Sequence, residues 1–499
     1  MKNYIKILIP IAILGGFTSC SNLEEEPYGF YSESNFYNNA AEAKSALTYA
    51  YDALTYLEYS RSYFVLGDLA SEECYPKNDE SVSLHSLNNW DYTNLKNNAT
   101  LTNFFKYAYI SINRANSVIQ NVEKANFPQA EKNEILGEAY FLRAWNYFNL
   151  VKAFGNVPMH FETVGSLEQT AAPLSKNLDE IYDRIIEDCE KSISLLKVNQ
   201  RLGRIDLVGS QALLSKVYLH IASSKNYNVP LYIEMSKDTN KMYQLAGQYA
   251  ESVLEQQGVY GFEQNLVDIY DVMKPLGKEN IFLLSMDRTG TSEGDYSKIS
   301  KLFIPYIAGG TIHLKNPDGS LTKSHDGWST YMTNVSFYES YDSADKRKTD
   351  LMVDVVYNDK GEATAKFPGS ISYPFTRKYI DPNFIGDKTS TKPFLLRYSD
   401  IALVYAEAVG PTSKGYQYVN HIRNRAGLSS LQSGLGIEEF RKAILEERKF
   451  ELAWEGNRLY DLRRFNLVSQ YVPEAAGLSS EQTCFYPIPQ LEIDLNNNL

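Results

Sequence analysis

The sequence predicts a mainly α-helical protein, and three observations carry that prediction. Apolar residues recur at helical spacing in long segments from one end of the chain to the other. The first of these segments, residues 40–57, is also rich in alanine, which favours helices. Helix-ending residues follow the strongest segment, residues 132–154, as Gly155 and then Pro158.

The predicted helices occur mostly as consecutive pairs. They cover residues 40–57, 101–122, 132–154, 178–196, 206–223, 243–256, 397–408, 416–425 and 437–455. Small residues such as Ala139 and Ala144 would let two helices approach closely, and aromatic side chains would fill the gaps. Stacked pairs of this kind are typical of tetratricopeptide-type repeats, where each pair buries a face against the next. Long loops interrupt the period, so we expect degenerate tetratricopeptide-like helix pairs rather than a regular array.

Two loop-rich segments interrupt these helices, at about residues 67–100 and 258–393. The second is rich in Gly, Pro, Ser, Asp and Tyr, and residues 351–367 carry a hairpin signal with a turn near 358–361. Loops of this length inside a helical protein are usually either functional or disordered. Their many aromatic residues argue against disorder. We therefore expect an ordered, loop-rich insertion that carries short hairpins and a functional surface.

Residues 1–19 are predicted to be a lipoprotein signal peptide. Two lysines flank the start of an apolar stretch that is too short to span a bilayer as a stable helix. Small residues then precede Cys20, a pattern that resembles the lipobox of bacterial lipoproteins, in which the cysteine is acylated and begins the mature protein. Cys20 would attach the protein to a membrane without crossing it. The alternative is an ordinary secretory signal in which this cysteine is incidental.

Residues 20–35 are predicted to be a lipid-anchored tether, and residues 36–499 a single helical domain. The tether contains three consecutive glutamates, at residues 24–26, followed by Pro27, and such a segment cannot build a core. An acidic run just behind the cysteine also resembles the surface-export signal of Bacteroidetes lipoproteins. That resemblance implies a location on the outer face of the outer membrane, whereas the alternative is a plain solvated linker.

Composition and motifs exclude several functions. The chain has 499 residues and a formal net charge of -12, so phosphate repulsion argues against a nucleic-acid partner. The cysteines and histidines lack zinc-ligand spacing, and residues 316–319 are interpreted as a plain turn in preference to a calcium loop. The sequence contains no motif of a nucleophilic, metal-dependent or nucleotide-binding enzyme. We therefore expect neither a metal nor a cofactor.

The segment 440–465 carries an unusual pattern. Residues 440 to about 455 have a helical composition, and Gly456 would end the helix. Apolar residues fall on two opposite sides of the helical wheel, so this helix would lie between other elements. The arc between those sides carries four charged residues at a spacing that lets neighbours pair: Arg448, Glu451, Glu455 and Arg458. Because charges inside a packed helix must be paired, we interpret them as a structural ion-pair clamp; a catalytic glutamate is the alternative.

Aromatic residues in the two loop-rich segments are the best candidates for binding a ligand. Trp90 lies in the first segment with Tyr75, and Trp328 lies in the second with Tyr306 and Tyr331. A flat aromatic ring suits the apolar C–H face of a sugar, while Asp, Asn and Arg suit its hydroxyl rim. We hypothesise that these five residues stack on a glycan. The alternative is that each tryptophan only anchors its loop on the helical body.

Several motifs, in order along the chain, resemble those of the SusD/RagB family of glycan-binding lipoproteins on Bacteroidetes outer membranes. They are GEAYFLRAWNYFNLVKAFGNVP (137–158), GRIDLVGSQALLSKVYLH (203–220), LRYSDIALVYAEAV (396–409), YVNHIRNRAGL (418–428), ILEERKFELAWEGNRLYDLRRF (444–465) and FYPIPQLEIDLN (485–496). The resemblance covers nearly the whole mature chain. It departs at the C-terminus, where the family's Asn-Pro-Gly type tail is replaced by Asn-Asn-Leu at 497–499.

This resemblance implies a tetratricopeptide-like body with a loop-built surface that binds an oligosaccharide or polysaccharide. It also implies a role in polysaccharide utilisation and a partner, a SusC-like TonB-dependent transporter, over which the lipoprotein acts as a hinged lid. It implies binding without catalysis. Binding residues vary within the family, so none is carried over individually. Two alternatives remain: an all-helical secreted glycoside hydrolase that uses two loop carboxylates, and a peptide-binding or assembly subunit of the same transporter.

Overall fold

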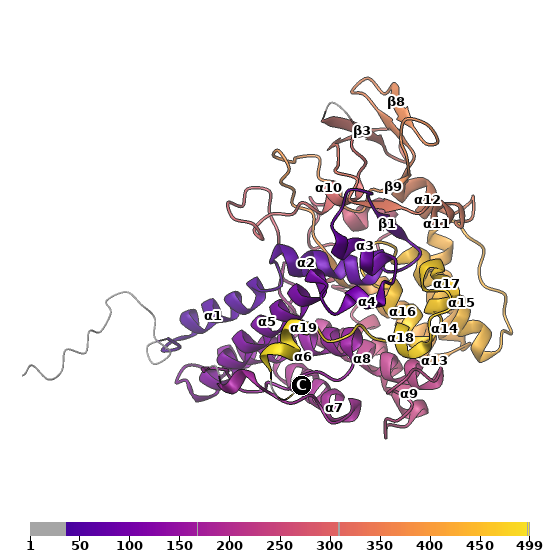
Figure 1. Cartoon of the computed structure of the whole chain (residues 1–499). Helices are drawn as coiled ribbons and strands as arrows, with labels where there is room; N and C mark the ends of the chain where they lie inside the picture. The colour runs from indigo at the N-terminus through magenta and orange to yellow at the C-terminus, as the bar shows by residue number, and fades with distance from the viewer. Residues whose placement is uncertain (1–35, 167, 308–309, 497, 499) are drawn as a thin grey trace, which may run out of the picture.

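The computed structural model describes residues 36–499, except residues 167, 308–309, 497 and 499. The predicted signal peptide, Cys20 and the tether therefore lie outside the described residues. The prediction of a mainly α fold is confirmed, because long helices build the body and the strands are few and short (Figure 1). Within the described part, no helix is both long and apolar enough to cross a membrane.

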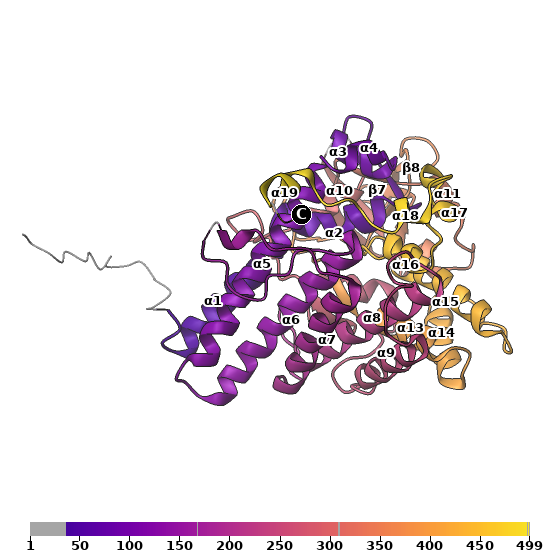
Figure 2. The same cartoon turned by 60° about the horizontal axis from the view of Figure 1, so that its bottom comes forward.

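The helical body is a row of helices, most of which pack against the next one along the chain. The longer helices are α1 (Ala40–Asp52), α2 (Leu57–Phe64), α5 (Ala99–Lys124), α6 (Gln129–Phe154), α7 (Leu178–Leu195), α8 (Leu207–Asn226), α9 (Thr239–Leu254), α13 (Tyr398–Val409), α14 (Ser413–Arg425), α15 (Ile437–Glu451) and α16 (Arg458–Arg464). Figure 2 shows α5, α6, α7, α8 and α9 side by side along the lower half of the molecule. A tetratricopeptide-like repeat within this row stays a prediction.

Helix α6 is the centre of this row, and local sequence explains where it lies and ends. It packs between α5 and α7, and its residues from Ile135 to Val151 are buried. Gly137 allows the close approach to α7, because a Cβ atom there would lie 2.6 Å from the Leu196 side chain. Gly155 adopts φ +76° directly after the helix, a conformation that glycine adopts without strain. The predicted end of this helix is therefore confirmed.

The loop-rich segments lie above the helical body and contain short elements. The strands are β1 (Cys74–Pro76), β2 (Asn280–Leu283), β3 (Thr311–Lys315), β4 (Leu321–His325), β5 (Tyr331–Thr333), β6 (Met352–Val353), β7 (Val355–Tyr357), β8 (Ala363–Lys366), β9 (Phe375–Thr376) and β10 (Phe394–Arg397). They form a four-stranded antiparallel sheet in the order β4-β3-β7-β8 and three pairs, β1 with β5, β2 with β10 and β6 with β9. The predicted hairpin is confirmed as β7 and β8, and residues 316–319 form the turn between β3 and β4.

Short helices and turns complete the chain. They are η1 (Val65–Leu69), α3 (Val82–Asn88), α4 (Tyr92–Leu95), η2 (Glu168–Thr170), η3 (Leu266–Tyr270), α10 (Ile299–Phe303), α11 (Val335–Glu339), α12 (Lys346–Leu351), α17 (Val468–Tyr471), η4 (Pro473–Ala475), α18 (Ser480–Thr483) and α19 (Gln490–Leu495). The main hydrophobic core runs through the helical body and reaches α10, and a smaller cluster around Ile312 and Val356 lies under the four-stranded sheet.

The helix predicted over residues 437–455 ends earlier than expected. Helix α15 stops at Glu451, and α16 begins at Arg458. Between them Trp454 and Gly456 adopt φ values of +58° and +75°, so the chain turns instead of continuing as a helix. This turn packs against η1, where a Cβ atom on Gly67 would overlap the carbonyl oxygen of Gly456. A contact distant in the sequence therefore sets the end of the helix.

Candidate functional site

A pocket of about 410 Å³ lies where the two loop-rich segments meet the N-terminal helices, and we call it the Trp328 pocket. Its walls come from α2 and η1, the start of α3, the start of α5, α10 and the chain that leads into β5. It is lined by Arg61, Ser62, Val65, Glu80, Ser81, Leu84, Thr100, Asn103, Leu302, Trp328, Thr330 and Tyr331. Both loop-rich segments thus contribute to one concave surface, as expected of a binding site.

Backbone hydrogen bonds to the end of α10 hold Trp328 in place. The Trp328 N–H donates to the carbonyl oxygen of Lys301 at 2.7 Å, and the Ser329 N–H donates to that of Ile304 at 3.1 Å. Gly327 makes this approach possible, because a Cβ atom there would overlap the Ile304 carbonyl oxygen. The indole is only partly buried and faces the pocket. Its position is therefore fixed by the backbone before any ligand binds.

Three polar side chains in the pocket are not used by the fold. Arg61 comes from α2, Glu80 precedes α3, and Asn103 comes from α5. All three are partly exposed, and across the described ranges no ion pair or side-chain hydrogen bond engages any of them. They supply a guanidinium donor, a carboxylate acceptor and an amide with both functions. Together with the indole, they provide an apolar face and a hydrogen-bonding rim, which is the chemistry that a sugar ring requires.

Tyr331 forms part of the same pocket but is largely enclosed. It is 4% exposed and packs edge-to-face on Phe303, with ring centroids 5.6 Å apart. Burial raises the pKa of the Tyr331 phenol well above its ordinary value, so the hydroxyl stays protonated at neutral pH. Tyr331 therefore presents a neutral hydroxyl or ring edge to the pocket and cannot serve as an open stacking platform.

Trp90 does not line the pocket, and its burial does not fit the predicted role in glycan stacking. It is 4% exposed, and its indole N–H donates to the carbonyl oxygen of Ala70 at 3.2 Å. Its ring stacks on Tyr486, with centroids 6.3 Å apart, and the Arg463 guanidinium lies 5.9 Å from the indole. Trp90 instead anchors the turn between α3 and α4 on the C-terminal segment, which was the alternative interpretation.

Tyr75 and Tyr306 have different positions relative to the pocket. Tyr75 pairs with Met332 across β1 and β5, while Tyr331 pairs with the next residue, Pro76. Because successive side chains of a strand point to opposite faces, Tyr75 points away from the face that carries Tyr331. Tyr306 is 70% exposed, and its backbone N–H donates to the Ser329 hydroxyl at 2.9 Å. Tyr306 is thus attached beside Trp328 at the surface, whereas Tyr75 is not part of the site.

Arg61, Glu80 and Asn103 could not be identified as pocket residues from the sequence. Arg61 and Asn103 lie on helices, where a polar residue usually marks a solvated face, and Glu80 follows other polar residues in a turn. Their common pocket forms only when the first loop-rich segment packs against the second, as the pairing of β1 with β5 shows. Sequence spacing carries no signal for a contact of this range.

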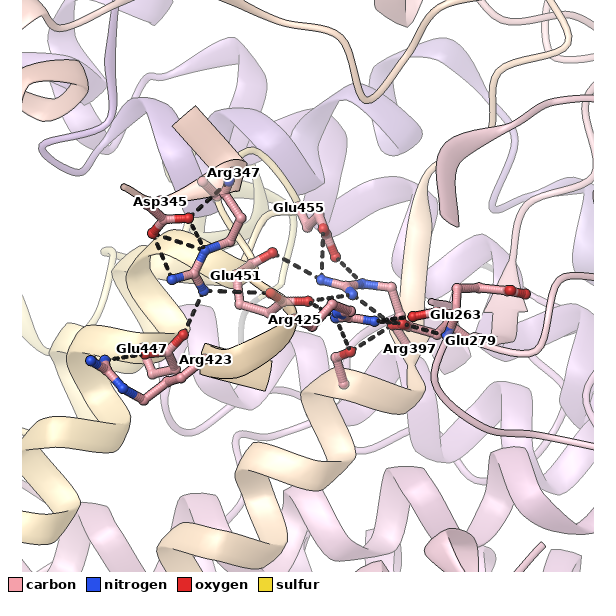
Figure 3. Close-up of polar contacts among 12 residues, drawn as sticks. Glu263, Glu279, Asp345, Arg347, Arg397, Arg423, Arg425, Glu447, Glu451 and Glu455 are labelled. Carbon is pink, nitrogen blue, oxygen red and sulfur yellow. Dashed lines mark hydrogen bonds and ion pairs between the residues drawn. The ribbon is translucent and has the colours of Figure 1, made fainter. Parts of the chain in front are cut away.

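The four residues of the predicted clamp are buried and ion-paired, but they do not pair with one another. Within the described part of the chain, each finds its partners on other segments. Figure 3 shows Glu451 with Arg347 on one side and with Arg397 and Arg425 on the other. Its carboxylate lies 2.8 Å from Arg397, 2.8 Å from Arg425 and 3.5 Å from Arg347. Although burial alone would raise it, Arg425 and Arg397 hold the pKa of Glu451 at about 2.

The other members of the clamp connect further segments. Glu455 pairs with Lys378 at 2.7 Å and with Arg397 at 3.1 Å. Arg448 pairs with Asp400 at 2.7 Å and with Asp461 at 2.8 Å. Arg458 pairs with Glu72 at 2.6 Å. The expected pairing between neighbours is wrong. Helical spacing does not continue to Glu455 and Arg458, because α15 ends at Glu451. Arg448 and Glu451 both lie in α15, but each pairs with side chains of other segments instead. All four side chains are enclosed and committed to partners, an arrangement that suits a structural role.

Neither a disulfide nor a metal site accounts for the fold of the described residues. Cys74, Cys189 and Cys484 are buried and free. Among the residues that the structure describes, no group of three or more His, Cys, Asp or Glu side chains is placed to hold a metal ion. The aromatic and polar side chains of the Trp328 pocket make up the candidate site.

Two family models match separate parts of the sequence. The model of the SusD family matches residues 350–477, and the model described as "Starch-binding associating with outer membrane" matches residues 31–219. Among full-length relatives, SusD-like protein P2 of Formosa agariphila is 26% identical over 100% of this chain and 99% of its own. A SusD-like protein of Bacteroides ovatus is 23% identical over 93% of this chain and 82% of its own.

Solved structures share the fold across almost the whole chain. A SusD homolog from Bacteroides thetaiotaomicron superposes with a TM-score of 0.77 at 19% identity, covering 94% of this chain and 97% of that chain. Surface glycan-binding protein A from the same organism, solved in complex with laminarihexaose, gives a TM-score of 0.72 at 21% identity, covering 92% and 98%. The row of helices with loop-rich segments above it is therefore a known architecture.

Proposed function

Because this chain belongs to the SusD/RagB family, we propose that it is a surface glycan-binding lipoprotein. It captures an oligosaccharide in the Trp328 pocket and delivers it to a TonB-dependent transporter of the outer membrane, without catalysis. The observation that carries this proposal is the partly exposed indole of Trp328 beside three uncommitted polar side chains. The similar proteins that are named for laminarin binding or surface glycan binding support it further.

The pocket suits a ligand that binds with modest affinity. The indole stacks on one sugar face, while Arg61, Glu80 and Asn103 bind hydroxyl groups around the ring. Contacts of this kind to one or two rings give affinities in the micromolar to millimolar range, or about -4 to -8 kcal/mol. A ligand held at this strength can be released to a transporter. Which hydroxyl groups are accepted depends on the three polar side chains.

The anchor and the partner are further parts of the proposal. Acylation of Cys20 would hold the protein at the outer membrane, and the acidic tether of residues 20–35 would let a single domain, residues 36–499, move over the transporter. The family model described as associating with the outer membrane supports this location. Globomycin treatment and radiolabelled palmitate in the native host would test the acylation, with Cys20→Ala as the control.

A glycan panel tests the proposed function. The purified protein, beginning at Ser21, is examined by gel retardation with polysaccharides and by calorimetry with oligosaccharides, and each mixture is checked for cleavage products. Retardation by one glycan class with intact ligand is the expected result. Cleavage of the ligand would contradict the proposal and direct attention to loop carboxylates. No binding across a broad panel would contradict it in favour of a peptide cargo or an assembly role.

A further inference from the structure

A second, much smaller cavity lies inside the helical body and shares no residue with the Trp328 pocket. It measures about 30 Å³ and is lined by residues of α6, α8, α13, α15 and α16, which Figures 1 and 2 show close together. Its lining residues are Phe148, Lys152, Lys216, Leu219, His220, Val404, Arg448, Asn457, Tyr460, Asp461 and Arg464. A polar cavity of this size has room for one water molecule or one monatomic ion.

Positive charge exceeds negative charge around this cavity. Lys152, Lys216, Arg448 and Arg464 line it, and the only acidic side chain in its lining is Asp461. Two further carboxylates, Asp400 and Glu407, lie behind these cations as their partners. The cavity and its immediate surroundings thus contain four cationic and three carboxylate side chains, and every one of these side chains is mostly buried.

The three carboxylates are already engaged, so they leave one cation without a counter-charge. Asp400 is bound by Lys216 and by Arg448 at 2.7 Å. Asp461 is bound by Arg448 at 2.8 Å and by Arg464 at 3.0 Å. Arg464 also donates twice to Glu407, with one contact at 2.7 Å. Each of these three carboxylates is therefore paired with a cation other than Lys152.

Lys152 is the cation in this cavity that has no carboxylate partner. Its ammonium lies 4.7 Å from the ring centroid of Phe148 and 4.4 Å from that of Tyr460. Across the described ranges, it forms neither an ion pair nor a hydrogen bond. The neighbouring Arg463 adds to the excess, because its guanidinium donates only to backbone carbonyl groups and its Nη2 has no partner.

We propose that this cavity binds one small inorganic anion, with chloride as the simplest example, between Lys152 and Lys216. A partly buried ammonium without a counter-charge is costly, and an anion in the adjacent cavity would offset that cost. Arg448 and Arg464 face the same space and add to the positive potential there. The site joins helices from the N-terminal and C-terminal parts of the chain, so its ligand stabilises the helical body and not the Trp328 pocket.

Protonation of Lys152 controls this binding. Burial, followed by repulsion from Lys216, lowers the pKa of Lys152 to about 7. The charged groups that face it are Lys216 on α8, Asp400 on α13, Arg448 on α15, and Asp461, Arg463 and Arg464 on α16. His220 on α8 also faces it, but burial lowers the pKa of His220 well below its ordinary value, so this side chain is neutral. Because the ammonium is charged below this pKa, anion binding is strongest near pH 6 and is lost towards pH 9.

Thermal unfolding of the mature protein tests the anion site. The Tm is measured in sodium chloride and in sodium gluconate of equal ionic strength, at pH 6 and at pH 9. A saturable chloride-dependent rise in Tm at pH 6 that disappears at pH 9 is the expected result. Lys152→Met should abolish this rise, whereas Lys44→Met, a change in a surface ion pair on α1, should leave it intact. Equal Tm values in the two salts, or a rise that persists in Lys152→Met, would overturn the proposal.

Crystals soaked in bromide provide an independent test. An anomalous peak among Lys152, Lys216 and Arg448 is the expected result, because bromide replaces chloride and scatters anomalously. A cavity that holds only a water molecule would overturn the proposal. Such a result would mean that Lys152 is neutral in the folded protein, so that no anion is needed to balance its charge. Glycan binding is unaffected by either outcome, so failure here is distinguishable from failure of the proposed function.

Discussion

The side-chain carboxyl group of Asp68 accepts a hydrogen bond from the backbone N–H of Gly456, at 2.9 Å and across 388 positions of the chain. Asp68 lies in η1, which continues directly from α2, the helix that supplies Arg61 to the Trp328 pocket. Glu73 makes a parallel contact, because it accepts the N–H of Trp454 at 3.2 Å. Hydrogen bonds therefore connect the α2 and η1 wall of the Trp328 pocket to the turn between α15 and α16. This turn lies at the edge of the buried ion-pair network.

Gly67→Ala should destabilise the protein. A methyl group at this position would overlap the Gly456 carbonyl oxygen, so the two backbones would have to separate. Overpacking of a buried contact costs about 1–3 kcal/mol of unfolding free energy, and this contact joins two rigid turns. Urea unfolding measures the loss. Gly258→Ala is the matched control, because no atom lies within 4 Å of a Cβ there, and equal midpoints for the two variants would contradict the predicted contact.

The raised pKa of Asp68 predicts that the unfolding free energy of the protein falls as the pH rises. Burial raises its pKa to about 8 in the folded protein, against 3.8 as its ordinary value. The folded state thus holds a proton that the unfolded state releases, so the unfolding free energy falls as the pH rises from about 4 to 8 and then levels off. The slope from one such group is at most about 1.4 kcal/mol per pH unit. Chemical unfolding at several pH values measures this dependence.

Asp68→Asn tests whether this carboxyl group is the origin of the decline. The amide keeps an acceptor for the Gly456 N–H but cannot ionise. The variant should therefore lose less stability between pH 5 and pH 8 than the unaltered protein does. Asp318→Asn, a change in the exposed turn between β3 and β4, is the control and should leave the pH dependence unchanged. Identical pH profiles for Asp68→Asn and the unaltered protein would rule out Asp68 as the source.

Glu451→Gln should be among the most destabilising single changes. Removal of this negative charge leaves Arg347, Arg397 and Arg425 with less compensation in a buried network, as Figure 3 shows. Loss of one partner of a buried ion pair typically costs about 3–5 kcal/mol. Glu438→Gln removes the charge of a half-exposed carboxylate that lies 3.6 Å from Arg441, and it should cost less than about 1 kcal/mol. If denaturant midpoints shift equally in the two variants, the network does not have the structural role described here.

Trp90→Ala should reduce stability without altering the affinity of the folded protein for its glycan. The ring is buried against Tyr486, and removal of a buried tryptophan costs about 3–5 kcal/mol. The measurement combines the unfolding midpoint with calorimetry below the unfolding transition. Trp90→Phe, which keeps part of the packing, should recover part of the lost stability. Loss of glycan binding in a well-folded Trp90→Phe variant would restore Trp90 as a ligand-binding residue.

The sequence predicted helices well because their periodicity is local. Helix α6 was expected over residues 132–154 and extends over Gln129–Phe154, since its apolar spacing and Gly155 are both visible in the chain. The end of α15 was missed, because the turn that follows it packs against Gly67, which lies far away in the sequence. Trp90 and Trp328 were assigned the same role because both lie in polar loops. Only their tertiary neighbours, Tyr486 for one and Lys301 for the other, distinguish an anchor from a pocket wall.

The identity of the side chains that pair with each charged residue was the least predictable feature of the structure. Arg448 and Glu451 were expected to be paired, yet their partners Asp400, Asp461, Arg397 and Arg425 come from three other helices and a strand end. A charged residue in a helical segment gives no indication of which distant segment will approach it. The same limit applies to Arg61 and Asn103, whose importance follows only from the pocket that they share with Trp328.

Calorimetry with Trp328→Ala and a glycan that binds the unaltered protein tests the central claim most directly. Tyr92→Ala is the matched control, because Tyr92 is 39% exposed and does not line the pocket. We expect at least about a tenfold loss of affinity in Trp328→Ala, or about 1.4 kcal/mol, with unchanged affinity in Tyr92→Ala and little change in either Tm. Equal affinity of the Trp328→Ala variant and the unaltered protein would contradict the claim that this pocket binds the glycan.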